Sequence, residues 1–197
     1  MIMTYDFVHG LLGCVVAGLG ITGISYAYYD FRYGAPTYPT NAAVRQRIIE
    51  ILRADWQSRG SGAYHVLDLG SGSGQLTWYI ARAMPEVQVT GIEISPIPWL
   101  RSVVRQKLFG PPNLRYLRCD FWGYDCRQHQ AVITYLLGPL MPRVSQKLWD
   151  ELPAEALVIS NRFPLQEPPW PLAVSVDVPF LFKSTLHLYR KPQMSNN

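Results

Sequence analysis

The chain has 197 residues, of which 48% are hydrophobic and only 16% are charged, so it can bury ample apolar surface and does not belong to the intrinsically disordered class. Its formal net charge is +4, but the cations come in no run longer than two, which excludes a polybasic nucleic-acid-binding tail. The three cysteines and four histidines are dispersed, so neither a disulfide framework nor a metal site is expected.

An uncharged segment from Phe7 to Tyr29 is the first feature along the chain, and it is bounded by Asp6 and Asp30. Its length matches the roughly 20 residues that a helix needs to cross a bilayer, and aromatic residues crowd its carboxyl end as in an interfacial belt. We therefore expect a single transmembrane anchor helix within residues 1–30. A signal peptide, which would need a basic leader, and a buried core helix, which is ordinarily shorter, are the alternatives.

The residues after this segment predict how the rest of the chain is organised. Cations follow the segment and none precedes it, so the positive-inside rule puts the body of the protein on the cytoplasmic, or matrix-equivalent, side of a single-pass protein. Two prolines interrupt residues 31–40, which form a linker. Residues 41–192 are expected to form one domain, followed by a disordered tail at 193–197.

Strands and helices alternate through this domain. After a helix that is capped by Thr40 or Asn41 and ends near Arg59, the patterns predict strands at 64–69, 87–93, 113–118, 131–135 and 156–160, and helices at 75–84, 96–109 and 139–152. Two late strands, 173–178 and 185–189, have no helix between them. The pattern is typical of an α/β, doubly wound, Rossmann-like sheet with an antiparallel carboxyl-terminal hairpin at one edge. The proline-rich stretch 166–171 is expected to be a surface loop.

A glycine-rich loop joins the first of these strands to its helix, at the place where open α/β sheets bind ligands. It reads D-x-G-x-G-x-G, with Asp68 at the strand end and with Gly70, Ser71, Gly72 and Gly74 in the turn. A P-loop would need Lys and Ser or Thr after the last glycine, and a nicotinamide-binding loop would read GxGxxG. Neither pattern is present.

This loop resembles motif I of class I S-adenosylmethionine-dependent methyltransferases. The resemblance implies that the turn binds the methionine and ribose parts of S-adenosyl-L-methionine. It further implies that an acidic residue ending the second strand, here Glu93, binds the ribose hydroxyls, and that one after the third strand, here Asp120 followed by Phe121, binds the adenine amine. Ionised carboxylates suit these roles because they accept charge-assisted hydrogen bonds. The alternative is that each carboxylate merely caps a helix or lies exposed.

Four blocks are similar to the small membrane-anchored protein-lysine methyltransferases, whose mitochondrial members modify the ATP synthase c-subunit and the adenine nucleotide translocase. They are the anchor with its Pro/Thr segment, Glu93 to Leu100, Cys119 to Trp122, and Val158 to Pro164. These blocks are distributed along most of residues 30–165. The loop departs from the family at Ser73-Gly74-Gln75, where the family usually has Asp and then Gly-Arg.

The resemblance implies methyl transfer to an amine, most simply the lysine of a membrane protein, by direct in-line displacement without a metal. Tyr135, after the fourth strand, and Tyr38, in the linker, are the residues expected to face the reacting groups, with Tyr38 stabilising positive charge through its ring. Trp99 and Trp122 either shape the adenine pocket or pack in the core. For Arg162-Phe163-Pro164 the alternative to a role in the site is that the block only orders the loop after the fifth strand.

Three other functions remain open at this stage. The same chemistry could act on a small amine or a lipid headgroup, or the chain could be an inactive protein that binds the cofactor as a scaffold. A nicotinamide oxidoreductase is disfavoured by the loop spacing. The expected partners are a membrane protein with an interfacial lysine and, through the anchor, the lipid bilayer. No nucleic acid is expected as a partner.

Overall fold

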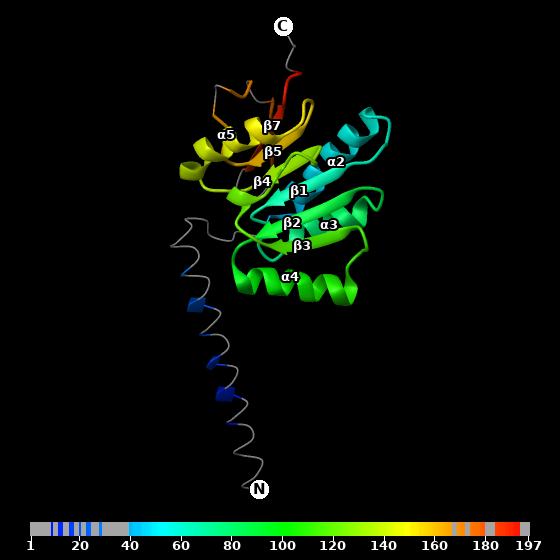
Figure 1. Ribbon diagram of the computed structural model, residues 1–197. Helices are drawn as coiled ribbons and strands as arrows, with labels where there is room; N and C mark the ends of the chain where they lie inside the picture. Colours follow the sequence, from blue (N-terminus) through cyan, green and yellow to red (C-terminus); the bar gives the residue numbers. More distant parts are fainter. Residues whose placement is uncertain are drawn as a thin grey trace. The chain divides into compact units, whose positions relative to one another are not determined.

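The computed structural model describes residues 40–166, 169–171, 174–179 and 184–193, together with nine positions between residues 9 and 28. By its internal contacts the chain divides into one unit up to Thr37 and a second from Tyr38 onward. Most helices and strands of the second unit are labelled in Figure 1.

Seven strands form a single sheet in the order β3-β2-β1-β4-β5-β7-β6. Their bounds are β1 His65–Leu69, β2 Gln88–Glu93, β3 Leu114–Arg118, β4 Ala131–Thr134, β5 Leu157–Asn161, β6 Val174–Val178 and β7 Ser184–Arg190. The first five strands pair in parallel, whereas β7 pairs antiparallel with both β5 and β6. The expected α/β sheet with an antiparallel edge hairpin is confirmed.

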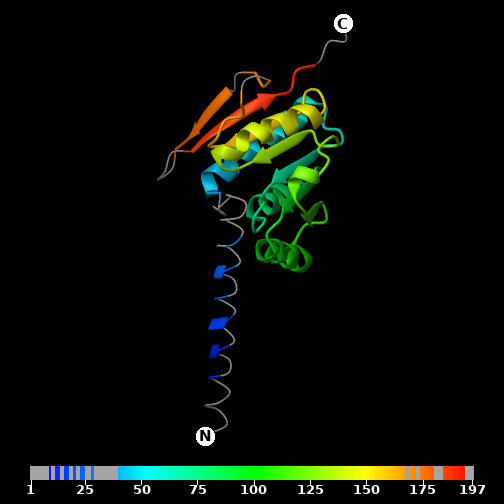
Figure 2. The same ribbon diagram turned by 60° about the vertical axis from the view of Figure 1, so that its left-hand side comes forward.

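Four helices cover the sheet: α2 Ala42–Ser58, α3 Gln75–Ala83, α4 Pro96–Phe109 and α5 Met141–Glu151. The buried faces of α2 and α3 join one apolar cluster with β-strand residues, and Trp99 and Val103 of α4 pack against the same cluster. Figures 1 and 2 show α5 on the opposite face of the sheet from α2 and α3. Short 3-10 turns, η1 at Phe121–Gly123 and η2 at Gly138–Leu140, complete the loops.

The helix boundaries follow local chemistry. Asn41 begins α2 as its N-cap and accepts the backbone N–H of Val44 at 2.9 Å, as short polar side chains do at helix starts. Pro96 lies in the first turn of α4, where its missing N–H costs nothing. In the expected surface loop 166–171, Gln166 and Pro171 are exposed, but Trp170 is buried and its indole N–H donates to the carbonyl of Ser145 at 2.8 Å. Burial of the indole holds this part of the loop against α5.

Most of the amino-terminal segment lies outside the described residues, and so does Tyr38. The nine described positions between 9 and 28 are all helical, and Leu12, Val16 and Ile24 among them are exposed. A search of the described residues finds no helix with the length and apolar character to span a membrane. The anchor at residues 1–30 thus stays a prediction.

Candidate functional site

The glycine turn after β1 has the backbone conformation that its sequence requires. Gly70, Gly72 and Gly74 all have positive φ, at 76°, 55° and 68°, a region that side chains bearing a Cβ rarely adopt. The backbone N–H groups of Gly70 and Ser71 both donate to the carbonyl of Ile92, at 3.0 and 2.8 Å. The turn is therefore fixed against the end of β2, and Gly74 leads directly into α3.

The turn is also packed tightly against a tyrosine ring from β3. A Cβ at Gly74 would overlap the ring of Tyr116, and one at Gly91 would lie 2.8 Å from the same ring and from Ser71 Oγ. The Tyr116 hydroxyl donates to the Gly74 carbonyl at 2.7 Å. Close approach of the ring thus adds a second requirement for glycine here. The Ser71 hydroxyl is buried and has no hydrogen-bond partner within the described part of the chain.

Glu93, at the end of β2, is the carboxylate that connects the turn to its neighbours. One oxygen accepts the backbone N–H of Gly72 at 2.8 Å, and the other accepts that of Ser95 at 2.7 Å. The side chain is only 7% exposed. Each carboxylate oxygen has a further lone pair, so both can still accept a hydroxyl from a bound ligand.

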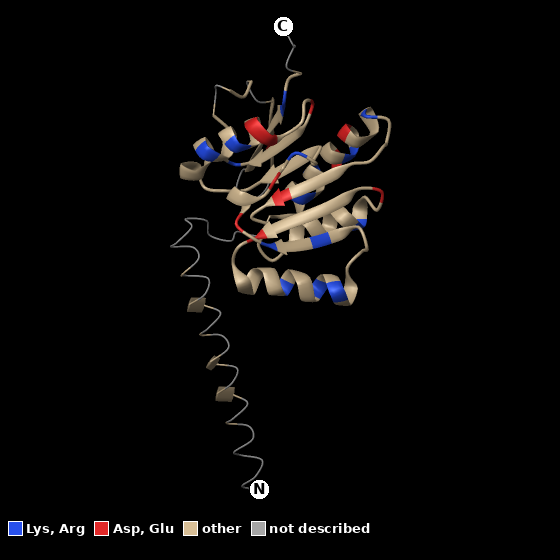
Figure 3. Cartoon of the chain, viewed as in Figure 1, with Lys and Arg blue, Asp and Glu red and all other residues tan. Residues whose placement is uncertain are grey.

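Asp68, in β1, is the second carboxylate of the site. It is 5% exposed, and burial, helped by repulsion from Glu93, raises the pKa of its side chain to about 7. The strands β1 and β2 are parallel neighbours, so their carboxyl ends meet at one edge of the sheet, and Figure 3 shows acidic positions at these neighbouring strand tips. Two close carboxylates with few protein donors favour a cationic or hydroxyl-bearing ligand.

Asp120 lies at the same edge, after β3, and has a structural role as well. Its side chain is exposed and accepts the backbone N–H of Trp122 at 3.0 Å, capping the η1 turn. Phe121 is half-buried and contacts Trp122 with ring centroids 4.6 Å apart. Asp120 therefore does cap a helix, and its second oxygen accepts no hydrogen bond from the described part of the chain.

The aromatic residues that the sequence singled out have different environments in the structure. Tyr135 follows β4 directly and is half-buried. Trp99 packs against the apolar core, which favours the core-packing alternative for it. Trp122 is partly covered, because the guanidinium of Arg143 lies over its ring at 4.0 Å.

Two further polar groups at the ends of β4 and β5 were missed by sequence reasoning. Thr134 is fully buried and Asn161 is 2% exposed, yet Thr134 Oγ1 and Asn161 Oδ1 have no hydrogen-bond partner among the described residues. The sequence signal was a polar residue closing an otherwise apolar strand. By register, Asp68 lies beside Ile133, and Ile133 lies beside Ile159. Since alternate residues share a face, Asn161 lies on the same face as Asp68.

The loop after β5 is held in an unusual conformation. Arg162 has φ 76° although it is not glycine, and such conformations cluster at functional sites. Its backbone N–H donates to the carbonyl of Thr185 at 2.8 Å, and Ser160 Oγ donates to the carbonyl of Phe163 at 2.5 Å. These bonds hold the loop against the sheet, in agreement with the loop-ordering alternative for the block that begins at Arg162.

The departure of the loop from the family pattern is accompanied by two arginines from other elements. Arg105 of α4 donates to the carbonyl of Ser73 at 2.8 Å, and Arg45 of α2 donates to Gln75 Oε1 at 3.2 Å. Positive charge therefore lies beside the end of the glycine turn, although the sequence there is neutral.

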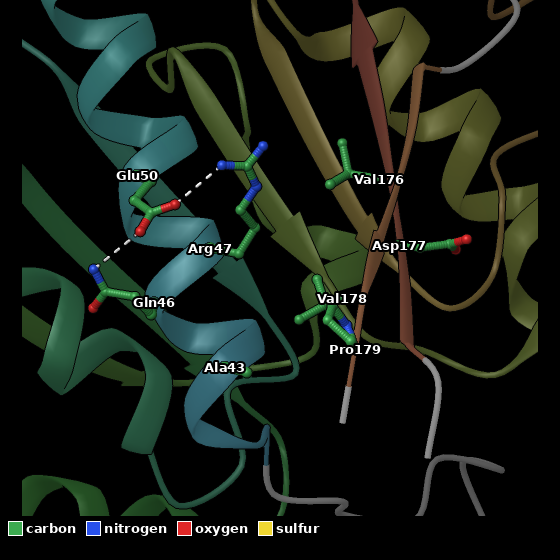
Figure 4. Close-up of a pocket in the computed structure, with 8 residues that line it drawn as sticks. All are labelled: Ala43, Gln46, Arg47, Glu50, Val176, Asp177, Val178 and Pro179. Atoms are coloured by element: carbon green, nitrogen blue, oxygen red, sulfur yellow. Dashed lines mark hydrogen bonds and ion pairs between the residues drawn. The ribbon is translucent and has the colours of Figure 1, made fainter. Parts of the chain in front are cut away.

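A separate hollow of about 370 Å³ lies between α2 and the edge strand β6 (Figure 4). Apolar residues Ala43, Val176, Val178 and Pro179 line it together with Gln46, Arg47, Glu50 and Asp177. Glu50 accepts hydrogen bonds from Gln46 at 3.2 Å and Arg47 at 3.0 Å, so the polar groups on the α2 side are already paired. Among the described residues no group of three or more His, Cys, Asp or Glu is placed to hold a metal ion.

Comparison with known proteins gives a family match over the same region. The ANTKMT methyltransferase domain matches residues 68–170, just over half of the chain. The adenine nucleotide translocase lysine N-methyltransferase of Mus musculus is 33% identical over 113 residues, covering 55% of this chain and 47% of the relative. The lysine N-methyltransferase of the ATP synthase c-subunit from Homo sapiens is 28% identical over 138 residues, covering 68% and 54%. The chain thus matches about half the length of these curated relatives.

Solved structures show the same fold. An RNA methyltransferase from Salinibacter ruber in complex with S-adenosyl-L-homocysteine superposes with a TM-score of 0.68 at 22% sequence identity, covering 81% of this chain and 98% of that one. At this identity the likeness establishes the fold alone.

Proposed function

The chain belongs to the ANTKMT methyltransferase domain family, and on that premise we propose that it transfers a methyl group from S-adenosyl-L-methionine to the side-chain amine of a lysine in a membrane protein. The observation that carries the proposal is the carboxyl edge of the sheet, where the left-handed glycine turn lies beside Asp68 and Glu93. This edge falls within the matched region.

The residues of the edge fit the cofactor. The buried Ser71 hydroxyl has no partner within the described residues, and both oxygens of Glu93 keep a free lone pair beside the turn, so the chain offers groups that ribose hydroxyls can bond. We assign Asp68, Gly70, Ser71, Gly72, Gly74 and Glu93 to the methionine and ribose parts, and Asp120 with Phe121 to adenine. The nearby carboxylates suit the positive charge of a sulfonium.

The reaction is a displacement in which a nitrogen–carbon bond forms as a sulfur–carbon bond breaks, so the bound cofactor supplies an electrophilic methyl group. The chain's own part is positioning, which can lower a barrier by about 7–11 kcal/mol. The target lysine must also lose its proton, at a cost of roughly 4.6 kcal/mol at pH 7 for a pKa near 10.4. An apolar surrounding at a membrane surface reduces that cost by disfavouring the ammonium form.

Tyr135 and Tyr38 are proposed to face the reacting amine. Tyr135 is half-buried at the end of β4, where it can orient a substrate group through its hydroxyl. The unpaired Oδ1 of Asn161 is suited to accept an N–H from the substrate amine, which would hold the nitrogen lone pair toward the methyl group. The anchor at residues 1–30, with exposed Leu12, Val16 and Ile24, is proposed to hold the enzyme in the bilayer.

The test is incubation of membranes with the full chain and radiolabelled S-adenosyl-L-methionine. Label in protein, with methyl-sized mass steps on lysine by mass spectrometry, is the expected result. Label in the lipid extract alone would replace the proposed substrate by a lipid headgroup. A calorimetric titration without binding at millimolar cofactor would exclude the enzyme altogether.

A further inference from the structure

Helix α4 carries an apolar stripe on the side that faces away from the sheet. Leu100, Val104 and Leu108 are 53%, 47% and 65% exposed, and Phe109 at the helix end is 75% exposed. The first three are spaced by four residues, so they lie above one another on one face. We call Leu100, Val104 and Leu108 the outer α4 stripe.

The other side of α4 is already used by the fold. Pro98 and Ser102 are buried, and Trp99 and Val103 pack against the apolar core. The core therefore uses the inner face of α4, and the outer α4 stripe is not part of it. Single exposed apolar residues are ordinary, but a contiguous row of them marks an interaction surface.

The charge around the stripe has one sign. Residues 94–119 contain five cations and no Asp or Glu, and the cations are Arg101, Arg105, Lys107, Arg115 and Arg118. Figure 3 shows α4 with basic positions and no acidic one. At about 100° per residue, Arg101 and Lys107 fall on opposite margins of the stripe. Both are exposed, and neither forms an ion pair within the described residues.

We propose that the outer face of α4 is a membrane-docking surface for an anionic lipid bilayer. An apolar stripe with cations at its margins lets the stripe enter the acyl boundary while the long basic side chains reach the lipid phosphates. A second copy of the chain fits the surface less well, because two such faces in contact would bring cations against cations. The charge thus selects an anionic surface as the occupant.

Helix α4 also contacts the glycine turn, so docking would place a bilayer-bound helix next to that turn. Arg105 extends from the same helix and donates to the carbonyl of Ser73 at 2.8 Å. The helix that lies on the bilayer would therefore be the one that contacts the cofactor loop. The docking proposal does not depend on the chemistry of that loop, so its test measures lipid contact and not methyl transfer.

The test uses the full chain reconstituted in vesicles, with a benzophenone-bearing amino acid in place of Val104 to cross-link whatever lies against it. The matched control carries the same group in place of Ala54, which is exposed on α2. Vesicles contain phosphatidylcholine alone or with phosphatidylglycerol. The expected result is lipid cross-linking at position 104 that exceeds that at position 54 and increases with the anionic lipid.

A charge-reversal variant, Arg101→Glu with Lys107→Glu, completes the test. Since each cation near an anionic surface adds to binding, we expect it to lower lipid cross-linking at position 104 at least about tenfold. Unchanged circular dichroism and thermal unfolding would show that the variant is folded. Equal cross-linking at positions 104 and 54, insensitivity to anionic lipid, or a cross-linked dimer through position 104 would each overturn the proposal.

Discussion

The Glu93 carboxylate accepts the backbone N–H of Gly72 at 2.8 Å, across 21 residues of sequence. With its second bond to the N–H of Ser95 at 2.7 Å, this side chain fixes the glycine turn to the end of β2. One residue thus shapes the loop and offers lone pairs to a ligand.

Glu93→Gln should weaken cofactor binding. The amide has one oxygen, so its NH₂ group must face one of the two backbone donors. We expect the Kd for S-adenosylmethionine to rise at least about tenfold and stability to fall by about 1–3 kcal/mol. Calorimetric titration and urea unfolding measure the two effects. Glu86→Gln, at an exposed turn position before β2, is the control, and an unchanged Kd for Glu93→Gln would remove Glu93 from the binding site.

Asp68→Asn should stabilise the free protein while weakening binding. Burial raises the pKa of Asp68 to about 7, so between pH 4 and pH 7 the unfolded chain is ionised where the folded chain is not. The free energy of unfolding of the natural protein therefore falls as pH rises through this window. The variant does not show this fall, because Asn does not ionise. We expect a higher Tm than the natural protein at pH 8 and the same Tm near pH 4.

The affinity of the natural protein should respond in the opposite sense. An ionised Asp68 attracts a positively charged ligand, so cofactor affinity should increase as pH rises through about 7. For Asp68→Asn this increase should disappear. Parallel affinity profiles for the two proteins would argue against a direct contact between Asp68 and the cofactor.

Gly74→Ala should lower the free energy of unfolding for two separate reasons. Gly74 has φ 68°, and a Cβ there would overlap the ring of Tyr116. The left-handed backbone costs about 1–2 kcal/mol, and overpacking against a buried ring adds about 1–3 kcal/mol. Gly60→Ala is the matched control, because Gly60 has φ 78° with nothing within 4 Å of its Cβ. If urea unfolding gave the same loss of stability for both variants, the Tyr116 ring would have moved aside at no energetic cost.

Asp55→Asn should weaken the connection between α2 and β7. Asp55 is buried and accepts hydrogen bonds from Tyr64, from Arg59 at 2.9 Å and from Arg190 at 2.6 Å. Burial raises its pKa, but these bonds outweigh burial and leave the net pKa below the usual range. The resulting stability is present above about pH 4 and is lost as pH falls through the lowered pKa.

The substitution should lower the free energy of unfolding by about 1.5–3 kcal/mol at pH 7. It should also reduce the loss of stability that the natural protein shows below pH 4. Urea unfolding between pH 3 and pH 7 measures both. Asp125→Asn, which breaks an exposed pair with Arg127, should change nothing measurable. If Asp55→Asn and Asp125→Asn gave the same stability at every pH, the ionised carboxylate of Asp55 would not stabilise the fold.

Asn161→Ala should lower turnover without weakening cofactor binding or the fold. Its Oδ1 has no partner within the described chain, so removing it breaks no hydrogen bond seen there, whereas a substrate N–H would lose its acceptor at a cost of about 1–3 kcal/mol. Thr134→Val is the control, because Thr134 also has an unpaired buried oxygen but lies beside Leu69 on the other face. Comparable kcat values for both variants and the natural protein would exclude Asn161 from substrate contact.

The order of strands and helices, the antiparallel edge hairpin and the glycine turn were all predictable from sequence, because each depends on periodicity and turn chemistry within short stretches of chain. The helix Pro96–Phe109 occurs with the bounds that its sequence predicts. The placing of Asp68 and Glu93 at one edge follows from parallel strand order, which the alternation of elements also implies.

Tertiary structure alone decided what these groups contact. The link between Arg105 and Ser73 spans 32 residues and that between Arg190 and Asp55 spans 135, and no local pattern encodes such partners. Trp170, in a stretch that reads as a surface loop, is buried because its indole finds a carbonyl on α5. Local residues determine which elements form, whereas the partners of a buried polar group depend on where distant elements pack.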